Sequence, residues 1–195
     1  MENHDAGQAV KLSCRNVWKI YGDTSDSFFM DGNGNVDDTQ AHVKKILKSE
    51  HIVANADVSF DVYAGEIFVI MGLSGSGKST IVRCLSRLVE PTAGDIILDG
   101  ENLLEKSAEE LIDIRRHKMG MVFQSFGLMP HLNVIDNIAF PLKLQGIEKA
   151  DRYAQAERVI ELVGLQGREN NFPNELSGGQ QQRVGIARSL SLIHI

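Results

Sequence analysis

The sequence lacks long apolar runs and any framework of cysteines. Its longest purely apolar stretch beside a motif, residues 67–71, is far shorter than the roughly 20 residues that a membrane-spanning helix needs. The two cysteines, Cys14 and Cys84, form neither a Cys-x-x-Cys pair nor a disulfide framework. Residues 1–7 contain no apolar run, so they do not have the pattern of a secretory signal. These absences favour a cytosolic protein that reaches a membrane only through a partner.

An excess of basic charge is also missing. The 195 residues carry 20 Lys and Arg against 26 Asp and Glu, for a formal net charge of -6. A general nucleic-acid binder normally presents a basic face to phosphates, so we expect no nucleic-acid partner. Apolar residues make up 43% and charged residues 24% of the chain. These values are ordinary for soluble proteins and predict a domain of α/β or α+β class.

A glycine-rich motif stands between an apolar segment and a helix-forming one. Residues 72–79, GLSGSGKS, satisfy the pattern G-x-x-x-x-G-K-[ST] and follow the apolar segment EIFVIM. In such a phosphate loop, backbone N–H groups turn inward around phosphates, and the positive end of the next helix points at them. Lys78 would contact the β- and γ-phosphates, and the Ser79 hydroxyl would ligate Mg²⁺. The predicted nucleotide contacts here are Gly72, Ser74, Gly75, Ser76, Gly77, Lys78, Ser79 and Thr80.

Hydrophobic periodicity predicts strands mainly in the first part of the chain and helices in the last part. The predicted strands are residues 9–20, 52–62, 66–71, 95–98 and 119–123. The predicted helices are residues 38–48, 78–89, 108–117, 134–144, 151–163 and 177–190. The first helix belongs to a turn-rich segment, 22–52, which we interpret as an insert. The order of elements predicts an α/β fold, with a P-loop NTPase core, an antiparallel β subdomain and an α-helical subdomain.

A second motif narrows the class of nucleotide-binding protein. Residues 176–180, LSGGQ, followed by QQRVGIARSL, match the signature sequence of ABC ATPases. Locally the motif predicts a helix N-terminus with Ser177 as N-cap, where exposed glycines form an anion site. The resemblance implies that Ser177, Gly178, Gly179 and Gln180 contact the γ-phosphate of ATP held by the phosphate loop of the opposite subunit. It therefore implies a homodimer, or a pair of nucleotide-binding subunits, with two shared sites.

Two further positions resemble functional residues of the same family. Residues 122–126, VFQSF, followed by LMPH, are similar to its Q-loop. The resemblance implies that Gln124 approaches Mg²⁺ and the attacking water, acting in catalysis together with Lys78, and that its loop meets the transporter's membrane subunit. Tyr21 stands where the family places an aromatic ring that stacks on adenine. A tyrosine that caps the core at a strand end is the alternative.

Four longer runs make the resemblance more specific. The runs EIFVIMGLSGSGKST, RLVEPTAGDIILDG, MVFQSFGLMPH and NELSGGQQQRVGIAR, with the insert at 22–52, resemble the ATP-binding subunits of glycine betaine/proline-type osmoprotectant importers. The resemblance implies an ATPase that uses ATP and Mg²⁺ at the cytoplasmic face of the plasma membrane. Its implied partners are permease subunits and, indirectly, a periplasmic or extracellular substrate-binding protein. An importer of another substrate class and a non-transport ABC protein of repair or translation are the alternatives.

The resemblance extends over residues 9–189, with the P-loop core and β subdomain at 9–125 and the helical subdomain at about 126–189. In the family, a strand ending in Asp-Glu, a D-loop and a switch histidine follow, and the 195 residues contain none of these. The Asp-Glu pair would hold Mg²⁺ and polarise the attacking water. We therefore expect a nucleotide-binding fragment without hydrolysis, whose core strands have unpaired edges. Residues 190–195, LSLIHI, match the translation of a DNA-library adapter, and we interpret them as a non-native tail.

Overall fold

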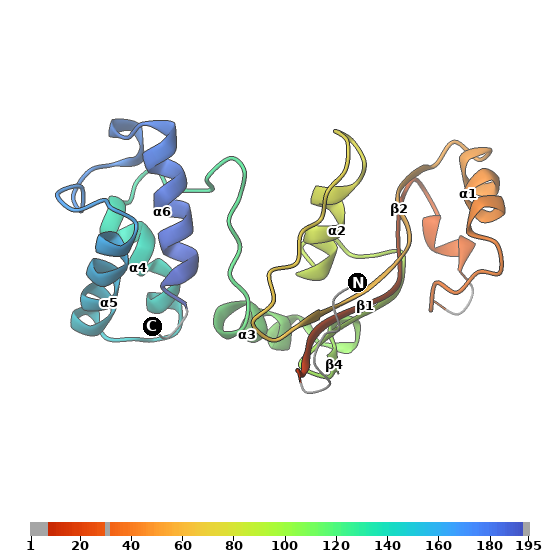
Figure 1. The fold of residues 1–195 in the computed structure, drawn as a ribbon, viewed down its shortest axis with the longest axis horizontal. Coiled ribbons are helices and arrows are strands. Elements are labelled where there is room, and N and C mark those ends of the chain that lie inside the picture. The colour runs from red at the N-terminus through yellow and green to blue at the C-terminus, as the bar shows by residue number, and fades with distance from the viewer. Residues whose placement is uncertain (1–7, 30–31, 193–195) are drawn as a thin grey trace. The chain divides into compact units, whose positions relative to one another are not determined.

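The computed structural model describes residues 8–29 and 32–192 (Figure 1). The chain divides into two compact units, Met1–Ser107 and Ala108–Ile195, called here the N-terminal and C-terminal units. This division falls earlier than the predicted boundary between residues 125 and 126. Helix α3 (Ala108–His117) belongs to the C-terminal unit and contacts later helices of that unit. One such contact is the hydrogen bond that Gln145 Nε2 donates to the Arg116 carbonyl oxygen, at 2.5 Å.

The N-terminal unit is built on an antiparallel sheet of four strands in the order β2-β1-β3-β4. Figure 1 shows the two long strands, β1 (Val10–Tyr21) and β2 (Ile52–Tyr63), running side by side. The shorter β3 (Ala93–Leu98) and β4 (Glu101–Asn102) extend the sheet from the other edge of β1, and the 3-10 turn η2 (Leu103–Glu105) follows β4. The predicted strands at 9–20, 52–62 and 95–98 are confirmed.

The segment at 22–52 forms a small cap on this sheet. It contains the 3-10 turn η1 (Ser25–Phe28) and helix α1 (Thr39–Leu47), whose N-cap Asp38 accepts a hydrogen bond from the Ala41 N–H at 3.0 Å. The indole Nε1 of Trp18, on β1, donates to the Gly34 carbonyl oxygen at 2.8 Å. The buried cluster between the cap and the sheet contains Trp18, Ile20, Phe29, Ile46 and Ala93. The predicted helix at 38–48 is therefore confirmed, and its apolar side closes one end of the sheet.

Helix α2 (Lys78–Leu85) follows the phosphate loop and contacts both β1 and β2. It ends about one turn earlier than the predicted residue 89. Arg87 adopts a left-handed conformation, with φ +50°, and its N–H donates to the Cys84 carbonyl oxygen at 2.8 Å. A left-handed residue at this place terminates a helix, so Arg87 accounts for the earlier end.

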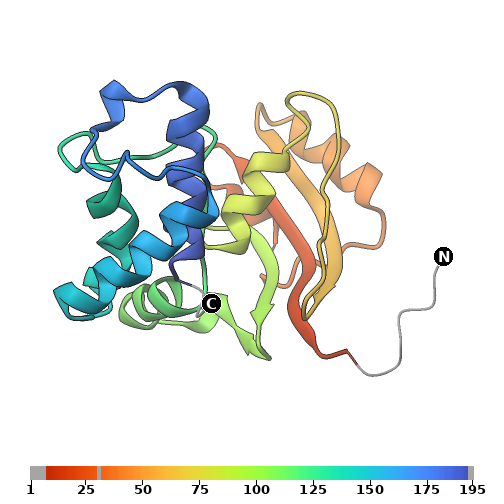
Figure 2. The ribbon, with the colours of Figure 1, turned by 60° about the vertical axis from the view of Figure 1, so that its left-hand side comes forward.

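The C-terminal unit is helical apart from its loops. Helices α4 (Val134–Leu144), α5 (Lys149–Leu162) and α6 (Gly178–Leu190) pack on one another, and the 3-10 turn η3 (Pro173–Glu175) precedes α6 (Figure 2). Their shared core contains Val134, Ile138, Ala156, Ile160, Leu165, Val184 and Ala187. The predicted helices at 108–117, 134–144, 151–163 and 177–190 are confirmed within two residues at each end. The predicted tail begins at the last residue of α6, and its residues 193–195 lie outside the described residues.

Two predicted strands are wrong. Residues 66–71 and 119–123 belong to no ladder among the described residues. Side chains of the first segment are strongly exposed, with Ile67 at 90% and Met71 at 85%. A parallel strand is stable when neighbouring strands accept and donate its hydrogen bonds, and the sheet of the N-terminal unit pairs neither segment. Within residues 8–29 and 32–192, these two predicted core strands of the P-loop fold therefore form no strand.

The helices can also be compared with the length and apolar character of a membrane-spanning helix. None of the helices in the described part of the chain has both the length and the apolar character needed to cross a bilayer.

Candidate nucleotide-binding site

The phosphate loop forms a tight turn at the start of α2. The Ser76 N–H donates to the Leu73 carbonyl oxygen at 3.2 Å, and Gly75 and Gly77 have φ of +78° and +83°. Only glycine adopts such backbone conformations without strain. Gly77 is the N-cap of α2 and supplies no side chain to its first N–H groups. The first-turn N–H groups and the positive end of the helix dipole are thus available to an anion.

Lys78 folds back over this loop. Its Nζ donates to the carbonyl oxygens of Gly72 at 2.8 Å and Leu73 at 2.6 Å, and to the Ser76 hydroxyl at 3.4 Å. The ammonium group therefore lies beside the loop, and its hydrogen-bond partners among the described residues are all neutral oxygens. Such a group can exchange these partners for phosphate oxygens, which carry charge and bind it more strongly.

Ser79 and Thr80 occupy the first turn of α2, after Lys78. The Ser79 side chain is exposed and lies in the same turn as the ammonium of Lys78. Gly72, Ser74 and Ser76 are exposed as well. Gly75 is also exposed, whereas Gly77, Lys78 and Thr80 are partly exposed.

Tyr21 ends β1 with 44% of its surface exposed. It pairs with Ile52 across the ladder, and Lys19 Nζ lies 4.9 Å from the centre of its ring. A ring that capped the core would be buried, so the exposure of Tyr21 does not fit that alternative. Its contact with adenine remains a prediction.

The signature segment forms the start of α6. Ser177 is the N-cap, and its Oγ accepts a hydrogen bond from the Gln180 N–H at 3.3 Å. In return, Gln180 Oε1 accepts from the Ser177 N–H at 2.9 Å, which completes a capping box. The predicted local role of Ser177 is confirmed. The Gln180 side chain is engaged within the helix start, while Gly178 and Gly179 are exposed and leave the helix end open to an anion.

The loop that carries Gln124 is held against α6. Gln124 itself is exposed, and two residues later Phe126 has φ +63°. Arg188, on α6, donates to the Gly127 carbonyl oxygen at 2.6 Å and to that of Phe126 at 3.4 Å. The Phe126 backbone also lies close to Gly185 of α6, where an added Cβ would be in van der Waals contact with the Phe126 carbonyl oxygen at 3.4 Å. The structure thus joins the Gln124 loop to the signature helix within the C-terminal unit.

Arg188 is a residue that the sequence analysis missed. Its guanidinium is partly buried, and this burial lowers its pKa from the usual value. The residue stands in the run that matches the signature sequence, but no spacing rule connects a helix residue with carbonyls some sixty positions earlier. Only the packing of the loop on α6 reveals the interaction.

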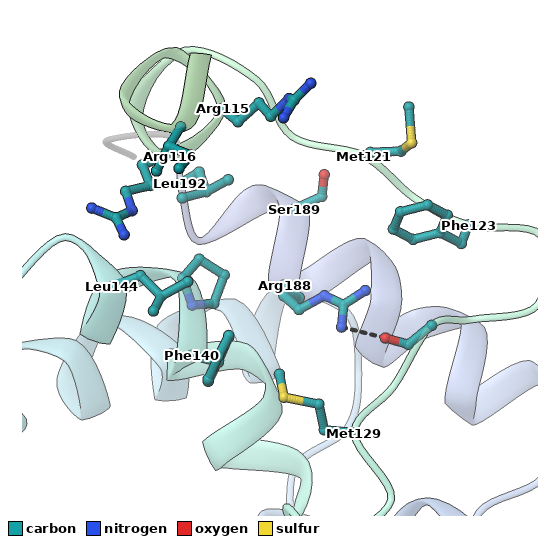
Figure 3. A pocket seen from close by; sticks show the side chains of 13 residues that line it. Arg115, Arg116, Met121, Phe123, Met129, Phe140, Leu144, Arg188, Ser189 and Leu192 are labelled. Carbon is teal, nitrogen blue, oxygen red and sulfur yellow. Dashed lines mark hydrogen bonds between the residues drawn. The ribbon is translucent and has the colours of Figure 1, made fainter. Parts of the chain in front are cut away.

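A groove of about 450 Å³ opens beside the same loop (Figure 3). Its walls are mainly apolar and come from α3, the segment at 121–129, α4 and α6. Figure 3 shows Met121, Phe123, Met129, Phe140 and Leu144 around it, with the Arg188 hydrogen bond at one side. The groove therefore places an apolar surface next to the exposed Gln124.

The cysteines lie outside these sites. Burial raises the pKa of Cys14 to about 12 and that of Cys84 to about 11. Both residues are buried, free thiols. They carry no thiolate near neutral pH, and we assign them no role in catalysis.

The predicted site residues thus form two sets. The phosphate loop and Tyr21 lie in the N-terminal unit, and Gln124 and the signature segment lie in the C-terminal unit. Each set contains a helix N-terminus whose first residues include exposed or left-handed glycines.

The chain is similar to known proteins over most of its length. The model of the ABC transporter family matches residues 55–192. The trimethylamine N-oxide transport system ATP-binding protein TmoW of Pelagibacter ubique (strain HTCC1062) is 52% identical over 181 residues, covering 93% of this chain and 52% of the relative. The glycine betaine transport ATP-binding protein OpuAA of Bacillus subtilis (strain 168) is 48% identical over 183 residues, covering 93% of this chain and 43% of the relative.

A solved structure supports the same assignment. The dimeric structure of MJ0796, a bacterial ABC transporter cassette, matches with a TM-score of 0.74 and 33% identity, covering 92% of this chain and 69% of that one. The predicted α/β fold of an ABC ATPase cassette is therefore confirmed. The chain spans about half the length of the curated relatives it matches. On the family match and the solved cassette together, the chain belongs to the ABC transporter ATP-binding family.

Proposed function

We propose that this chain binds ATP through its phosphate loop. The observation that carries the proposal is the position of Lys78, whose Nζ lies over the loop with only neutral oxygens as partners. The open first turn of α2 adds N–H donors on the same side. Tyr21, with its exposed ring, supports an adenine contact in the same unit.

We also propose that Mg²⁺ accompanies the nucleotide. Mg²⁺ usually keeps several waters and takes only one or two protein ligands when it binds phosphates. The described residues hold no group of three or more His, Cys, Asp or Glu side chains that could bind a metal alone. The exposed hydroxyl of Ser79, in the first turn of α2, therefore fits Mg²⁺ that arrives with ATP. Gln124 is proposed as the second residue that approaches the metal, and the ion would neutralise phosphate charge.

For the whole protein, we propose ATP hydrolysis that drives import of a small osmoprotectant of the betaine type. Named relatives support this substrate class, among them glycine betaine and trimethylamine N-oxide transport proteins. The signature segment would act on ATP bound by a paired subunit, as the dimeric state of the solved cassette suggests. Permease subunits are proposed to contact the apolar groove beside Gln124, at the cytoplasmic face of the membrane, with a substrate-binding protein as an indirect partner.

A second proposal concerns the 195 residues by themselves. They contain no Asp-Glu pair after α6, and the segment before the phosphate loop has no ladder partner among the described residues. We therefore expect the chain alone to bind ATP without turning it over. Sustained phosphate release by the purified chain that disappears in Lys78→Ala would refute this second proposal.

The binding proposal is tested by calorimetric titration of the chain with ATP and Mg²⁺. Lys78→Ala should weaken binding about 10- to 100-fold, because it removes a charge-assisted contact with the phosphates. Lys44→Ala is the matched control, since Lys44 is an exposed lysine on α1, away from the loop. Equal affinities for wild type and Lys78→Ala would contradict the proposed site.

A further inference from the structure

Strand β2 contacts the phosphate loop directly, at Ala54 and Asn55. The Asn55 Nδ2 donates a hydrogen bond to the Gly77 carbonyl oxygen at 3.3 Å. A Cβ added at Gly77 would lie 2.1 Å from the Ala54 carbonyl oxygen and 2.8 Å from Asn55 Nδ2. The last glycine of the loop is therefore pressed against β2, and the Asn55 side chain reaches its peptide group.

The Gly77 carbonyl oxygen is also the acceptor that starts α2. It accepts a hydrogen bond from the Ile81 N–H at 2.9 Å, which is the first bond of the helix. Gly77 has no side chain to cap the helix. The Asn55 amide thus holds the one peptide group that joins the loop to the helix. Its orientation decides where the first N–H groups of α2 point.

Among the described residues, the contact with Gly77 is the hydrogen bond that accounts for the Asn55 amide. Asn55 is 9% exposed. It lines a cavity of about 410 Å³ together with apolar residues such as Phe60 and Ile81 and with the polar residues Ser59, Ser76 and Lys78. Its Oδ1 is buried and has no hydrogen-bond partner in the part of the chain that the structure describes. A buried acceptor without a partner is unfavourable, and an apolar side chain would fill the same space. The favourable contribution of Asn55 therefore lies in its Nδ2 and the Gly77 carbonyl.

We propose that Asn55 is a positioning residue of the phosphate loop. It holds the Gly77 peptide so that the first-turn N–H groups of α2 and the Lys78 ammonium face the nucleotide phosphates. The inference rests on the proposed function, because it assigns Asn55 to the same ATP site.

The test compares three variants by calorimetric titration with ATP and Mg²⁺. Asn55→Leu removes the donor and keeps the approximate volume, so ATP binding should weaken about three- to tenfold, the range of one hydrogen bond. Asn102→Leu is the control for lost stability. Asn102 also uses its amide within the N-terminal unit, donating to Asp95 and accepting from the Leu104 N–H. Asn102→Leu should lower stability and leave the affinity for ATP unchanged.

Asn55→Asp separates the hydrogen bond from packing. At pH 8 its carboxylate is an acceptor only and faces another acceptor, so ATP binding should be weaker than in wild type. On protonation the carboxyl gains an O–H that can donate to the Gly77 carbonyl oxygen, and burial favours this neutral form. The loss of ATP affinity in Asn55→Asp, relative to wild type at the same pH, should therefore become smaller as the pH falls from 8 to about 5.5. A merely structural role would not restore affinity at low pH.

Amide hydrogen exchange without nucleotide makes the test independent of ATP binding. Exchange of the Ile81 N–H should be faster in Asn55→Leu than in wild type and in Asn102→Leu. Unchanged exchange at Ile81, or ATP affinity in Asn55→Leu within twofold of a wild type that binds, would overturn the inference. If wild type binds no ATP but Ile81 exchange accelerates in Asn55→Leu, the proposed function fails and the anchoring of Gly77 by Asn55 stands.

Discussion

At the scale of single residues, buried polar side chains hold backbone that forms no helix or strand. Asn137 is fully buried on α4, and its Oδ1 accepts from the Met129 N–H at 2.9 Å. Its Nδ2 donates to the carbonyl oxygens of Met129, Leu132 and Asn133, at 2.8–3.1 Å. One amide thus fixes the loop that leads from Gln124 to α4.

Asn137→Leu should lower the free energy of unfolding by about 2–3 kcal/mol, because the Met129 N–H and its carbonyl lose their partner in a buried site. Urea denaturation followed by circular dichroism measures the change. Asn171→Leu is the control, since that side chain makes one long bond of 3.4 Å to Glu175. We expect it to change stability by less than about 0.5 kcal/mol. Similar losses in the two variants would contradict the anchoring role of Asn137.

His42 gives the N-terminal unit a dependence on pH. Its ring packs against Trp18, Phe28 and Phe29, and its Nε2 is buried without a hydrogen-bond partner among the described residues. Burial, and then the charge of Lys45, lower the pKa of His42 below the usual 6.5. Protonation therefore favours the unfolded chain, so stability should be constant above about pH 6.5 and fall as the pH drops through the folded pKa.

Urea midpoints at pH 7.5 and pH 5 test this expectation. Wild type should lose more stability on acidification than His42→Phe, which keeps an aromatic ring and removes the titrating group. The difference between the two profiles isolates His42, because the other histidines are present in both proteins. Parallel profiles would show that His42 titrates with the same pKa in the folded and unfolded chains.

At the scale of elements, the N-terminus of α6 combines a helix cap with a proposed anion site. Ser177 belongs to both. Ser177→Ala should lower stability by about 1 kcal/mol through loss of the N-cap. Ser177→Asp should keep the stability, since aspartate is a good N-cap and interacts favourably with the helix dipole. Its charge should nevertheless repel the γ-phosphate.

Ser177→Asp should therefore impair ATP-dependent dimerisation of the whole protein, measured by sedimentation velocity, without a loss of stability. Asn133→Ala provides the opposite control. It removes the N-cap of α4, whose side chain accepts from the Asp136 N–H at 2.9 Å, and should lower stability but not dimerisation. Normal dimerisation of Ser177→Asp would exclude a phosphate contact at this residue.

Elements with local signals could be predicted from the sequence, whereas elements that need distant partners could not. The spacing of apolar residues and the Ser177 cap identify α6, and the glycine pattern identifies the phosphate loop. Residues 66–71 have the composition of a strand, but a strand also requires a neighbour in the sheet. The hydrogen bonds of Asn55, Asn137 and Arg188 likewise depend on tertiary packing, which no local pattern encodes.

At the scale of the whole molecule, the segment before the phosphate loop leaves apolar side chains in water. Ile67, Val69, Met71 and Leu73 are 64–90% exposed, and contiguous apolar surface with unpaired backbone promotes association. We expect the 195-residue chain to self-associate at micromolar concentration through this segment.

Val69→Lys should reduce this self-association in sedimentation velocity and leave the far-ultraviolet circular dichroism spectrum unchanged. Leu162→Lys is a matched control, because Leu162 is 63% exposed on α5 and Val69 is 64% exposed. If both substitutions reduce association equally, net charge and not the segment at 67–73 governs it.

Because Trp18 packs against His42, tryptophan fluorescence can also report on the cap at 22–52. Trp18 is the only tryptophan of the sequence, and its ring centre lies 5.4 Å from that of His42. A protonated imidazole close to an excited indole quenches its emission, whereas a neutral imidazole quenches it much less. Tryptophan emission, recorded as a function of pH, therefore reports the charge of His42 without any label, and the C-terminal unit contributes no tryptophan to this signal.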